Sequence, residues 1–323
     1  MKKYIYIALA AAAFASCSQD DAIEMNRQEI GFGEAFVENA TRAMGANDYS
    51  GTKLLEGFKV YGTVTGNANT LNLFQGVEIV RPTNGQTNAG DWNAVWKYKN
   101  DTDKEYWVPN CTYNFAAIVD GTVPSDGYST TGMPTKINYS LGTGDLLYAT
   151  ATADTKTNGA PTNNGIVSFT FTHLLSKVYF SVVDNFSTQN NDYKYEISDI
   201  TVSGIPTQGV YTVGSAENNG TWAAVGNTTV SAESPLNFGK ATEDHLIIPV
   251  NQTMTVKFSY DVKFNGQTIS TIPVEKTLAY PFAQKTVYNI QVTLPALGNE
   301  IKFTVQEMPE NAWTNGGSPS ITL

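Results

Sequence analysis

The sequence is poor in the residues on which many reactive centres depend. Its 323 residues include two cysteines, two histidines and three arginines, which are Arg27, Arg42 and Arg81. Two cysteines cannot form a disulfide framework, and two histidines cannot form a metal site of several imidazoles. A Gly-x-Ser-x-Gly elbow and a phosphate-binding glycine loop are also missing from the sequence. We therefore expect no metal, no cofactor and no catalytic residues.

The charge balance and the composition exclude further kinds of protein and indicate the fold class. The chain has 30 acidic and 20 basic side chains, a net charge of −10 and a pI near 4.7, which argues against a nucleic-acid partner. It is rich in residues that suit pleated strands and tight turns, with 39 Thr, 29 Asn, 27 Gly and 17 Tyr. No stretch of twelve or more residues carries a helical apolar stripe. The composition predicts an all-β fold.

The first residues have the features of an export signal. Lys2 and Lys3 precede an apolar run over residues 5–15 that is too short to span a bilayer, which is typical of a secretory signal peptide over residues 1–16. The next residue, Cys17, completes a segment that resembles a bacterial lipobox. The acidic stretch over residues 18–21 is similar to the surface-export signal of Bacteroidales lipoproteins. Lipidation at Cys17 is therefore expected, and an ordinary cleaved signal is the alternative.

A short strand and an accessible arginine follow. Ile30, Phe32 and Phe36 alternate with small or polar residues, which predicts a strand. Arg42 and Ala43 lie just beyond it, in a polar segment where a protease could cut. One interpretation is a removable strand released by cleavage between Arg42 and Ala43. The other is simply a first strand and its loop.

The rest of the chain reads as short strands separated by turns. Alternating or continuous apolar segments predict strands over residues 58–64, 71–80, 112–118, 146–152, 166–172, 254–264, 269–274, 288–294 and 301–305. The Asn265-Gly266 pair predicts a two-residue hairpin turn. A polar stretch over residues 154–165 is the best linker, so we expect β-sandwich domains over residues 43–160 and 161–323.

An aromatic cluster is the clearest candidate binding surface. Trp92, Trp96 and Trp107 lie close together with two tyrosines, and exposed aromatic faces bind partners such as glycans. The even spacing of Trp92, Trp96 and Tyr98 equally suits one buried face of a strand, and this core interpretation is preferred. His173, His245 and Cys111 are each expected to be structural residues rather than reactive ones.

The N-terminal signals, Thr41-Arg42-Ala43 and the segment Phe171-Thr-His-Leu-Leu-Ser-Lys177 resemble the fimbrillins of Bacteroidales type V pili. The resemblance implies two transthyretin-like β-sandwich domains in tandem and no enzymatic activity. It also implies a lipidated propeptide over residues 17–42, an Arg-specific processing protease, and polymerisation by donor-strand exchange with other pilus subunits. The location implied is the outer-membrane surface and the fimbria, with adhesion to a host or microbial glycan or protein ligand.

Two C-terminal segments are candidate donor strands. Ile301, Phe303 and Val305 alternate with polar residues, and Ile321 and Leu323 form a second, terminal piece. Ordinary last strands of the second domain remain the alternative. For the whole chain, the alternative function is a monomeric, glycan-binding surface lipoprotein that uses the aromatic cluster.

Overall fold

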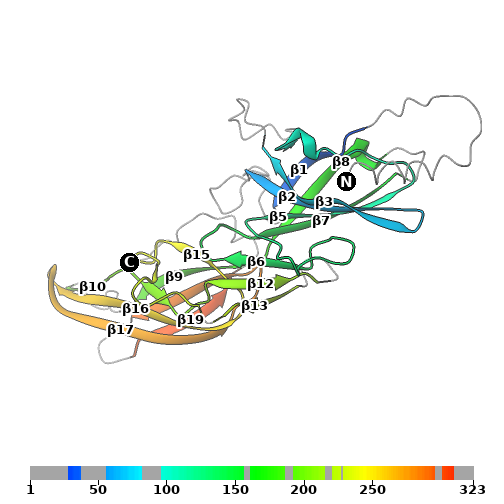
Figure 1. Cartoon of the computed structure of the whole chain (residues 1–323). Coiled ribbons are helices and arrows are strands. Elements are labelled where there is room, and N and C mark those ends of the chain that lie inside the picture. The colour runs from blue at the N-terminus through cyan, green and yellow to red at the C-terminus, as the bar shows by residue number, and fades with distance from the viewer. Residues whose placement is uncertain are drawn as a thin grey trace, which may run out of the picture.

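A computed structural model describes residues 28–37, 56–81, 96–155, 161–185, 192–214, 220–226, 228–294 and 300–308. The regular secondary structure of these ranges is almost all β-strand, with two short 3-10 helices, η2 (Asp101–Asp103) and η3 (Thr162–Gly165), and no α-helix among them. The predicted all-β fold class is therefore confirmed. Figure 1 shows two lobes placed end to end, with a small sheet at their junction.

The N-terminal lobe is a seven-stranded sheet in the order β1-β8-β7-β5-β2-β3-β4. Its strands are β1 (Gly31–Val37), β2 (Gly57–Gly66), β3 (Asn69–Val80), β4 (Lys97–Tyr98), β5 (Thr112–Val119), β7 (Leu147–Asp154) and β8 (Ile166–His173). One face of the sheet encloses an aromatic core that includes Phe58, Phe115 and Phe169, all buried. The predicted strands of this region are present, each extended by a few residues at most.

The C-terminal lobe packs two sheets around a second core. One has the order β10-β16-β11-β14 with β17 on the other side of β16, and the other has the order β15-β9-β18-β19. The strands are β9 (Ser176–Asp184), β10 (Tyr193–Ile197), β11 (Thr201–Ser203), β14 (Leu236–Asn237), β15 (Asp244–Ile247), β16 (Asn251–Phe264), β17 (Gln267–Pro281), β18 (Val287–Leu294) and β19 (Lys302–Glu307). Phe180, Val256 and Ile290 come from both sheets and are fully buried between them.

The predicted hairpin is the longest one among the described residues. β16 and β17 pair antiparallel from Asn251–Pro281 at the base to Phe264–Gln267 at the tip. Asn265 and Gly266 have φ angles of 49° and 80°, so both occupy the left-handed region that a two-residue turn of this kind requires. The Asn-Gly prediction is confirmed at both turn positions.

The lobes meet at a third sheet and a third core. β6 (Lys136–Ser140), β12 (Gln208–Thr212) and β13 (Thr221–Ala224) form a three-stranded sheet between the lobes (Figure 1). Leu174 and Leu175, the only residues between β8 and β9, are fully buried there. The Trp222 Nε1–H group donates a hydrogen bond of 2.8 Å to the Leu174 carbonyl.

The chain changes sheet later than the sequence predicts. We expected the boundary between residues 160 and 161, but β8 pairs with β1 and β7 in the N-terminal lobe. The chain therefore passes from one lobe to the other at Leu174 and Leu175. The polar stretch over residues 154–165 has the composition of a linker between domains. In the structure it lies before β8, the last strand that the chain adds to the N-terminal sheet.

Buried polar groups fix the same junction. The His173 Nδ1 atom lies 2.6 Å from the Asp145 Oδ2 atom, and both side chains are buried. Lys177 is also buried and pairs with the half-exposed Asp244 carboxylate at 2.7 Å. His245 Nε2 lies 2.7 Å from the Asn237 carbonyl oxygen. These contacts fit the structural role expected of both histidines.

Replacing His173 by alanine should strongly destabilise the fold. The substitution would leave the buried Asp145 carboxylate without its partner, and the other carboxylate oxygen, Oδ1, already has none among the described residues. Losing one partner of a buried pair costs about 3–5 kcal/mol. Urea unfolding should show a loss of this size for His173→Ala and a clearly smaller one for His245→Ala. Equal losses would show that the His173–Asp145 pair has no special role.

Candidate functional site

The strand β1 lies between the two edges of the N-terminal sheet. On one side it pairs parallel with β8, from Gly31–Ile166 to Val37–Phe171. On the other side it meets the chain that surrounds β4, through isolated bridges from Phe32 to Trp96 and from Glu29 to Tyr106. We call the space that β1 occupies, between β8 and residues 96–107, the β1 slot. With β1 in place the sheet closes on itself.

Backbone hydrogen bonds hold β1 on its second side as well. The Ile30 N–H group donates to the Glu105 carbonyl at 2.9 Å, and the Trp96 N–H group donates to the Phe32 carbonyl at 3.0 Å. The Trp107 N–H group donates to the Gln28 carbonyl at 3.0 Å. Since β8 supplies a ladder on the opposite side, removing β1 would leave unpaired backbone groups along both walls of the slot.

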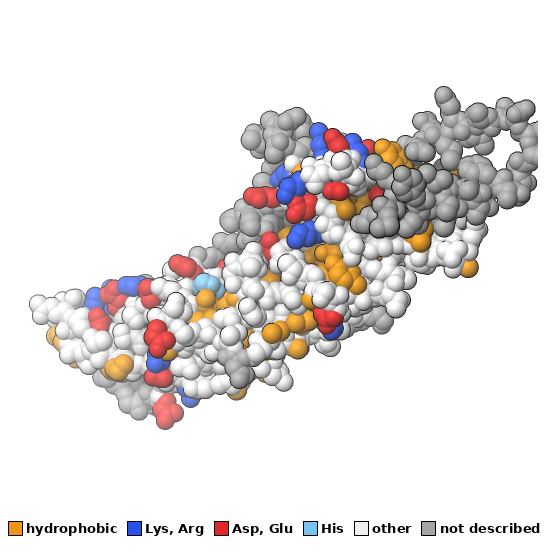
Figure 2. Space-filling view, in the orientation of Figure 1, with side chains coloured by type: hydrophobic (Ala, Val, Ile, Leu, Met, Phe, Trp, Pro, Cys, Tyr) orange, Lys and Arg blue, Asp and Glu red, His pale blue; other side chains and the backbone are white. Residues whose placement is uncertain are grey.

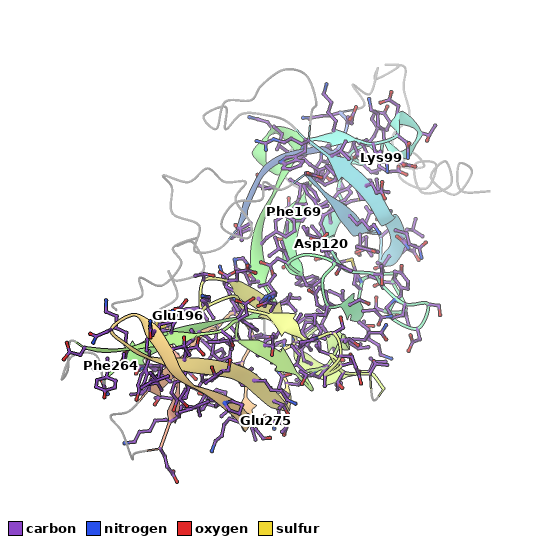
Figure 3. All side chains as sticks on the ribbon, turned by 90° about the vertical axis from the view of Figure 1, so that its left-hand side faces the viewer. Lys99, Asp120, Phe169, Glu196, Phe264 and Glu275 are labelled. Atoms are coloured by element: carbon purple, nitrogen blue, oxygen red, sulfur yellow. The ribbon has the colours of Figure 1, made fainter. Side chains whose placement is uncertain are left out.

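The inward side chains of β1 belong to the core of the lobe. Ile30 and Phe32 are fully buried, and Ala35 and Val37 nearly so. The Phe32 ring contacts four rings, with centroid distances of 6.4, 5.9, 5.6 and 6.1 Å to Phe58, Phe74, Tyr98 and Phe169. Figure 3 shows Phe169 within the N-terminal lobe. The strand that closes the sheet thus also supplies the centre of the core.

Tyr98 joins the core to the backbone of β1. Its hydroxyl group donates a hydrogen bond of 2.7 Å to the Ile30 carbonyl oxygen. Burial raises the pKa of Tyr98 far above its ordinary value, which keeps the hydroxyl protonated and able to donate. This contact is specific for a backbone carbonyl and does not depend on the side chain at position 30.

One glycine of β1 is required by its neighbour. A Cβ atom added to Gly33 would lie 2.4 Å from the Ile166 Cγ2 atom on β8, closer than any side chain tolerates. At Gly31 the nearest atom would be 3.6 Å away, which is ordinary contact. A strand that takes the same path as β1 therefore has room for a side chain at the position of Gly31, whereas any larger residue at the position of Gly33 requires the Ile166 side chain to move.

The two described tryptophans of the aromatic cluster, the alternative binding platform, are buried. Trp96 and Trp107 are 6% and 8% exposed, and both belong to the core around the β1 slot. The Trp107 Nε1–H group donates to the Gly165 carbonyl at 3.2 Å, beside the first residue of β8. Neither ring presents a face to a glycan in this form of the protein, and Trp92 lies outside the described residues. The core interpretation of Trp96 and Tyr98 fits their burial.

The remaining predicted residues fall into two groups. Cys17, Arg42, Ala43, Ile321 and Leu323 lie outside the described residues, and Phe36 is described only through its backbone pairing with Thr170. Ile301, Phe303 and Val305 lie in or beside β19, which pairs antiparallel with β18 at the edge of its sheet. Their side chains are half-buried against the C-terminal core.

The sequence did not reveal what lines the β1 slot. Phe58, Phe74 and Phe169 belong to strands that the alternation predicts, but their meeting with Phe32 depends on sheet order, which alternation does not encode. Cys111 is free and buried, as expected. Among the described residues no three His, Cys, Asp or Glu side chains cluster as a metal site would require. In those same ranges no helix has the length and apolarity needed to cross a membrane.

Replacing Phe32 by alanine should destabilise the N-terminal lobe. Truncating a buried phenylalanine costs about 3–5 kcal/mol. Phe264→Ala, at a ring that is 38% exposed on the C-terminal hairpin, should cost far less. Tryptophan fluorescence during urea unfolding measures the stability loss of each variant, since Trp96 and Trp107 flank the slot. If the two variants lost the same stability, β1 would not be part of the cooperative core.

Several solved structures are similar to this chain, and the first one below, with a TM-score above 0.5, shares its fold. A fimbrial protein from Bacteroides vulgatus is 16% identical, with 86% of this chain and 99% of that chain covered and a TM-score of 0.54. A Bacteroides ovatus protein with a proposed role in cell adhesion is 13% identical, with 88% and 96% covered and a TM-score of 0.48. A fimbrial assembly protein from Parabacteroides distasonis is 13% identical, with 87% and 97% covered and a TM-score of 0.42. No curated protein matches the sequence significantly.

A family of proteins described as fimbrillin-like matches residues 41–307, which is well over half of the chain. This match confirms the resemblance predicted from the N-terminal signals and the segment around His173. It also indicates a structural, non-enzymatic protein of a cell-surface appendage. The chain belongs to the fimbrillin-like family.

Proposed function

We propose that this fimbrial subunit is exported as a lipoprotein, loses β1 by cleavage after Arg42, and polymerises when a strand of a neighbouring subunit enters the β1 slot. The role as a pilus subunit in adhesion follows from the family. The observation that carries the finer mechanism is the position of β1, which comes first in the described chain yet fills the centre of a core. Cys17 and Arg42 supply the lipid and the cleavage point on either side of it.

Removing β1 would leave a slot with a strong affinity for a strand. Burying a large apolar side chain contributes about 1.5–3 kcal/mol, and β1 buries Ile30, Phe32 and Val37 together with Ala35. Each strand hydrogen bond adds about 0.5–1.5 kcal/mol net. A replacement strand recovers both contributions, whereas an empty slot exposes the aromatic core to water. The free energy therefore favours capture of a strand from another subunit.

The β19 segment supplies a matching side-chain pattern. Ile301-Lys302-Phe303 has the same Ile-x-Phe spacing as Ile30-Gly31-Phe32, so its apolar side chains suit the same pockets. In the identical register, however, Thr304 would fall at the position of Gly33, where Ile166 leaves no room. A β19 donor must therefore shift its register, reverse its direction or displace Ile166. The terminal piece with Ile321 and Leu323 remains the second candidate.

The two lobes are proposed to be the two transthyretin-like domains. In a stalk subunit the N-terminal lobe would receive a strand and the C-terminal lobe would donate one. A tip or anchor subunit would use only one of these interactions. The second candidate function, a monomeric glycan binder that uses the aromatic cluster, loses support because Trp96 and Trp107 are buried.

Cleavage after Arg42 should trigger polymerisation. The chain from Ser18 onward, treated with an Arg-specific protease, should give filaments by electron microscopy and a ladder on an unboiled denaturing gel. Arg42→Ala should abolish both, because β1 stays attached and occupies the slot. Arg27→Ala is the matched control, since Arg27 precedes β1 and its loss should leave the ladder unchanged. A cleaved but stable monomer would contradict strand exchange.

A synthetic peptide covering residues 28–37 should block assembly. The peptide reproduces β1, so in excess over cleaved subunits it should refill the slot and shorten the ladder. The same peptide with Phe32→Ala should block far less, since it lacks the ring that contacts four others. Equal inhibition by both peptides would place the polymer contact elsewhere. Deleting residues 309–323, compared with Phe303→Ala, then distinguishes the two candidate donors.

A further inference from the structure

β1 carries one residue more than its partner β8 can pair with. The register runs one-to-one as far as Phe32, opposite Val167, and resumes at Ala35, opposite Phe169. Residues 33 and 34 therefore share the single β8 position between those two pairs. An extra residue of this kind is a β-bulge, which stays unpaired and interrupts the hydrogen-bond ladder. We call residues 33 and 34 the β1 bulge.

The irregularity belongs to β1 rather than to β8. From Ile166 to Phe171, exposed and buried side chains alternate along β8, which is the pattern of a straight strand. Along residues 30–37, the buried side chains are Ile30, Phe32, Ala35 and Val37. One step between them spans three residues and the others span two. A straight strand in this position would keep the two-residue step throughout.

The bulge accounts for the glycine at position 33. Backbone conformation does not require a glycine there, because the φ angle of Gly33 lies outside the left-handed region. Space does: an added Cβ atom would lie 2.4 Å from the Ile166 Cγ2 atom and 3.5 Å from the Ser168 Oγ atom. In a straight strand the same position would lie directly opposite Ser168, at the ordinary strand spacing of about 4.8 Å. A straight strand therefore has room for a side chain where β1 has none.

The bulge also divides β1 into a tightly held half and a less tightly held one. Before the bulge, Ile30 and Phe32 form backbone hydrogen bonds with the second wall of the slot, and the Tyr98 hydroxyl group donates to the Ile30 carbonyl. After the bulge, residues 35–37 pair with β8, and within the part of the chain that the structure describes no hydrogen bond joins them to the second wall. The half nearer in sequence to Arg42 is therefore the one that a competing strand can displace first.

Charge gives the slot little means of selecting its occupant. On the face of the N-terminal lobe that Figure 2 shows, acidic and basic side chains are intermingled rather than segregated by sign. The core around the slot is formed mainly by aromatic and aliphatic side chains. The selection between strands therefore depends on backbone pairing with β8 and on the spacing of apolar side chains.

We propose that the bulge makes β1 the weaker of two occupants, and that the β1 slot is shaped for a straight strand of another subunit. This inference rests on the proposed strand exchange and describes the partner strand. It has seven residues, one fewer than residues 30–37, pairs one-to-one with β8, and carries apolar side chains at its first, third, fifth and seventh positions. Such a strand keeps the pairing that the bulge interrupts and adds the side-chain contacts that Gly33 lacks. The difference in pairing gives the exchange its direction, from β1 to the incoming strand.

The first test needs neither cleavage nor assembly. In the uncleaved chain from Ser18, deleting Glu34 removes the bulge and leaves Gly33 opposite Ser168, while the residues on both sides keep their partners on β8. We expect the deletion to raise the midpoint of thermal unfolding by about 2–4 °C, the shift expected when one strand pairing is regained. Deleting Gly33 instead removes the same bulge and should also raise the midpoint, so the result does not depend on a single variant.

A substitution at position 33 then shows whether the bulge is the cause. Gly33→Ala in the parent chain should lower the midpoint by about 2 °C or more, because the added Cβ atom meets Ile166. The same substitution in the Glu34 deletion should leave the midpoint unchanged or raise it, since residue 33 then lies opposite Ser168. Gly31→Ala is the matched control: the atom nearest its Cβ atom would be 3.6 Å away, so the midpoint should change little in either chain.

Peptides test the same preference during assembly. A peptide covering residues 28–37, and the same peptide without Glu34, are each added to cleaved protein while the ladder forms. The straight peptide should block the ladder at about tenfold lower concentration, because it regains one strand pairing.

Three results would overturn the proposal: deletion variants no more stable than the parent, a Gly33→Ala loss that persists after the bulge is removed, or equal blocking by the two peptides. A ladder that forms despite any of these results would leave strand exchange standing without the role of the bulge. More stable deletion variants, combined with no ladder after cleavage of the parent, would support the stronger pairing of a straight strand and overturn strand exchange.

Discussion

The closure of the N-terminal sheet by β1 is the constraint on which the rest of this lobe depends. Six of its strands are joined by antiparallel pairing along the chain, and their order leaves an edge at β8 and another at β4. Both edges would carry unpaired backbone groups, and the core between them would be open. β1 satisfies both edges and places Phe32 among four rings. The lobe therefore relies on a strand that lies only a few residues before the predicted cleavage point.

The junction places the two lobes in one arrangement. Leu174 and Leu175 leave no free linker between β8 and β9, and both are fully buried. Trp222 bonds to the backbone of this connection, while His173 and Lys177 bring buried polar contacts to its two ends. A buried connection of this kind resists bending because any rotation would expose a core and break paired polar groups. The two lobes therefore form one rigid, elongated rod rather than two domains joined by a flexible linker.

The sequence predicts the strands well and the site only in part. Alternation of apolar residues identifies β1, β16, β18 and β19, and Asn265-Gly266 identifies the hairpin turn, because these signals are local. The lobe boundary was misplaced because a polar loop looks like a linker whether or not another strand of the same sheet follows. The pairing of β1 with β8 joins residues more than a hundred positions apart in the chain, and the four rings around Phe32 come from four different strands, 26 to 137 positions away.

The parallel pairing of β1 with β8 has a mechanical consequence. A strand held in this position and pulled along its length is loaded in shear, so the hydrogen bonds on both sides must break together rather than one after another. The load then passes into β8 and, through Leu174 and Leu175, directly into β9, which lies in the middle of the next lobe. Tension along the rod is thus carried by backbone and paired strands from one end to the other, with no slack segment between the lobes to extend first.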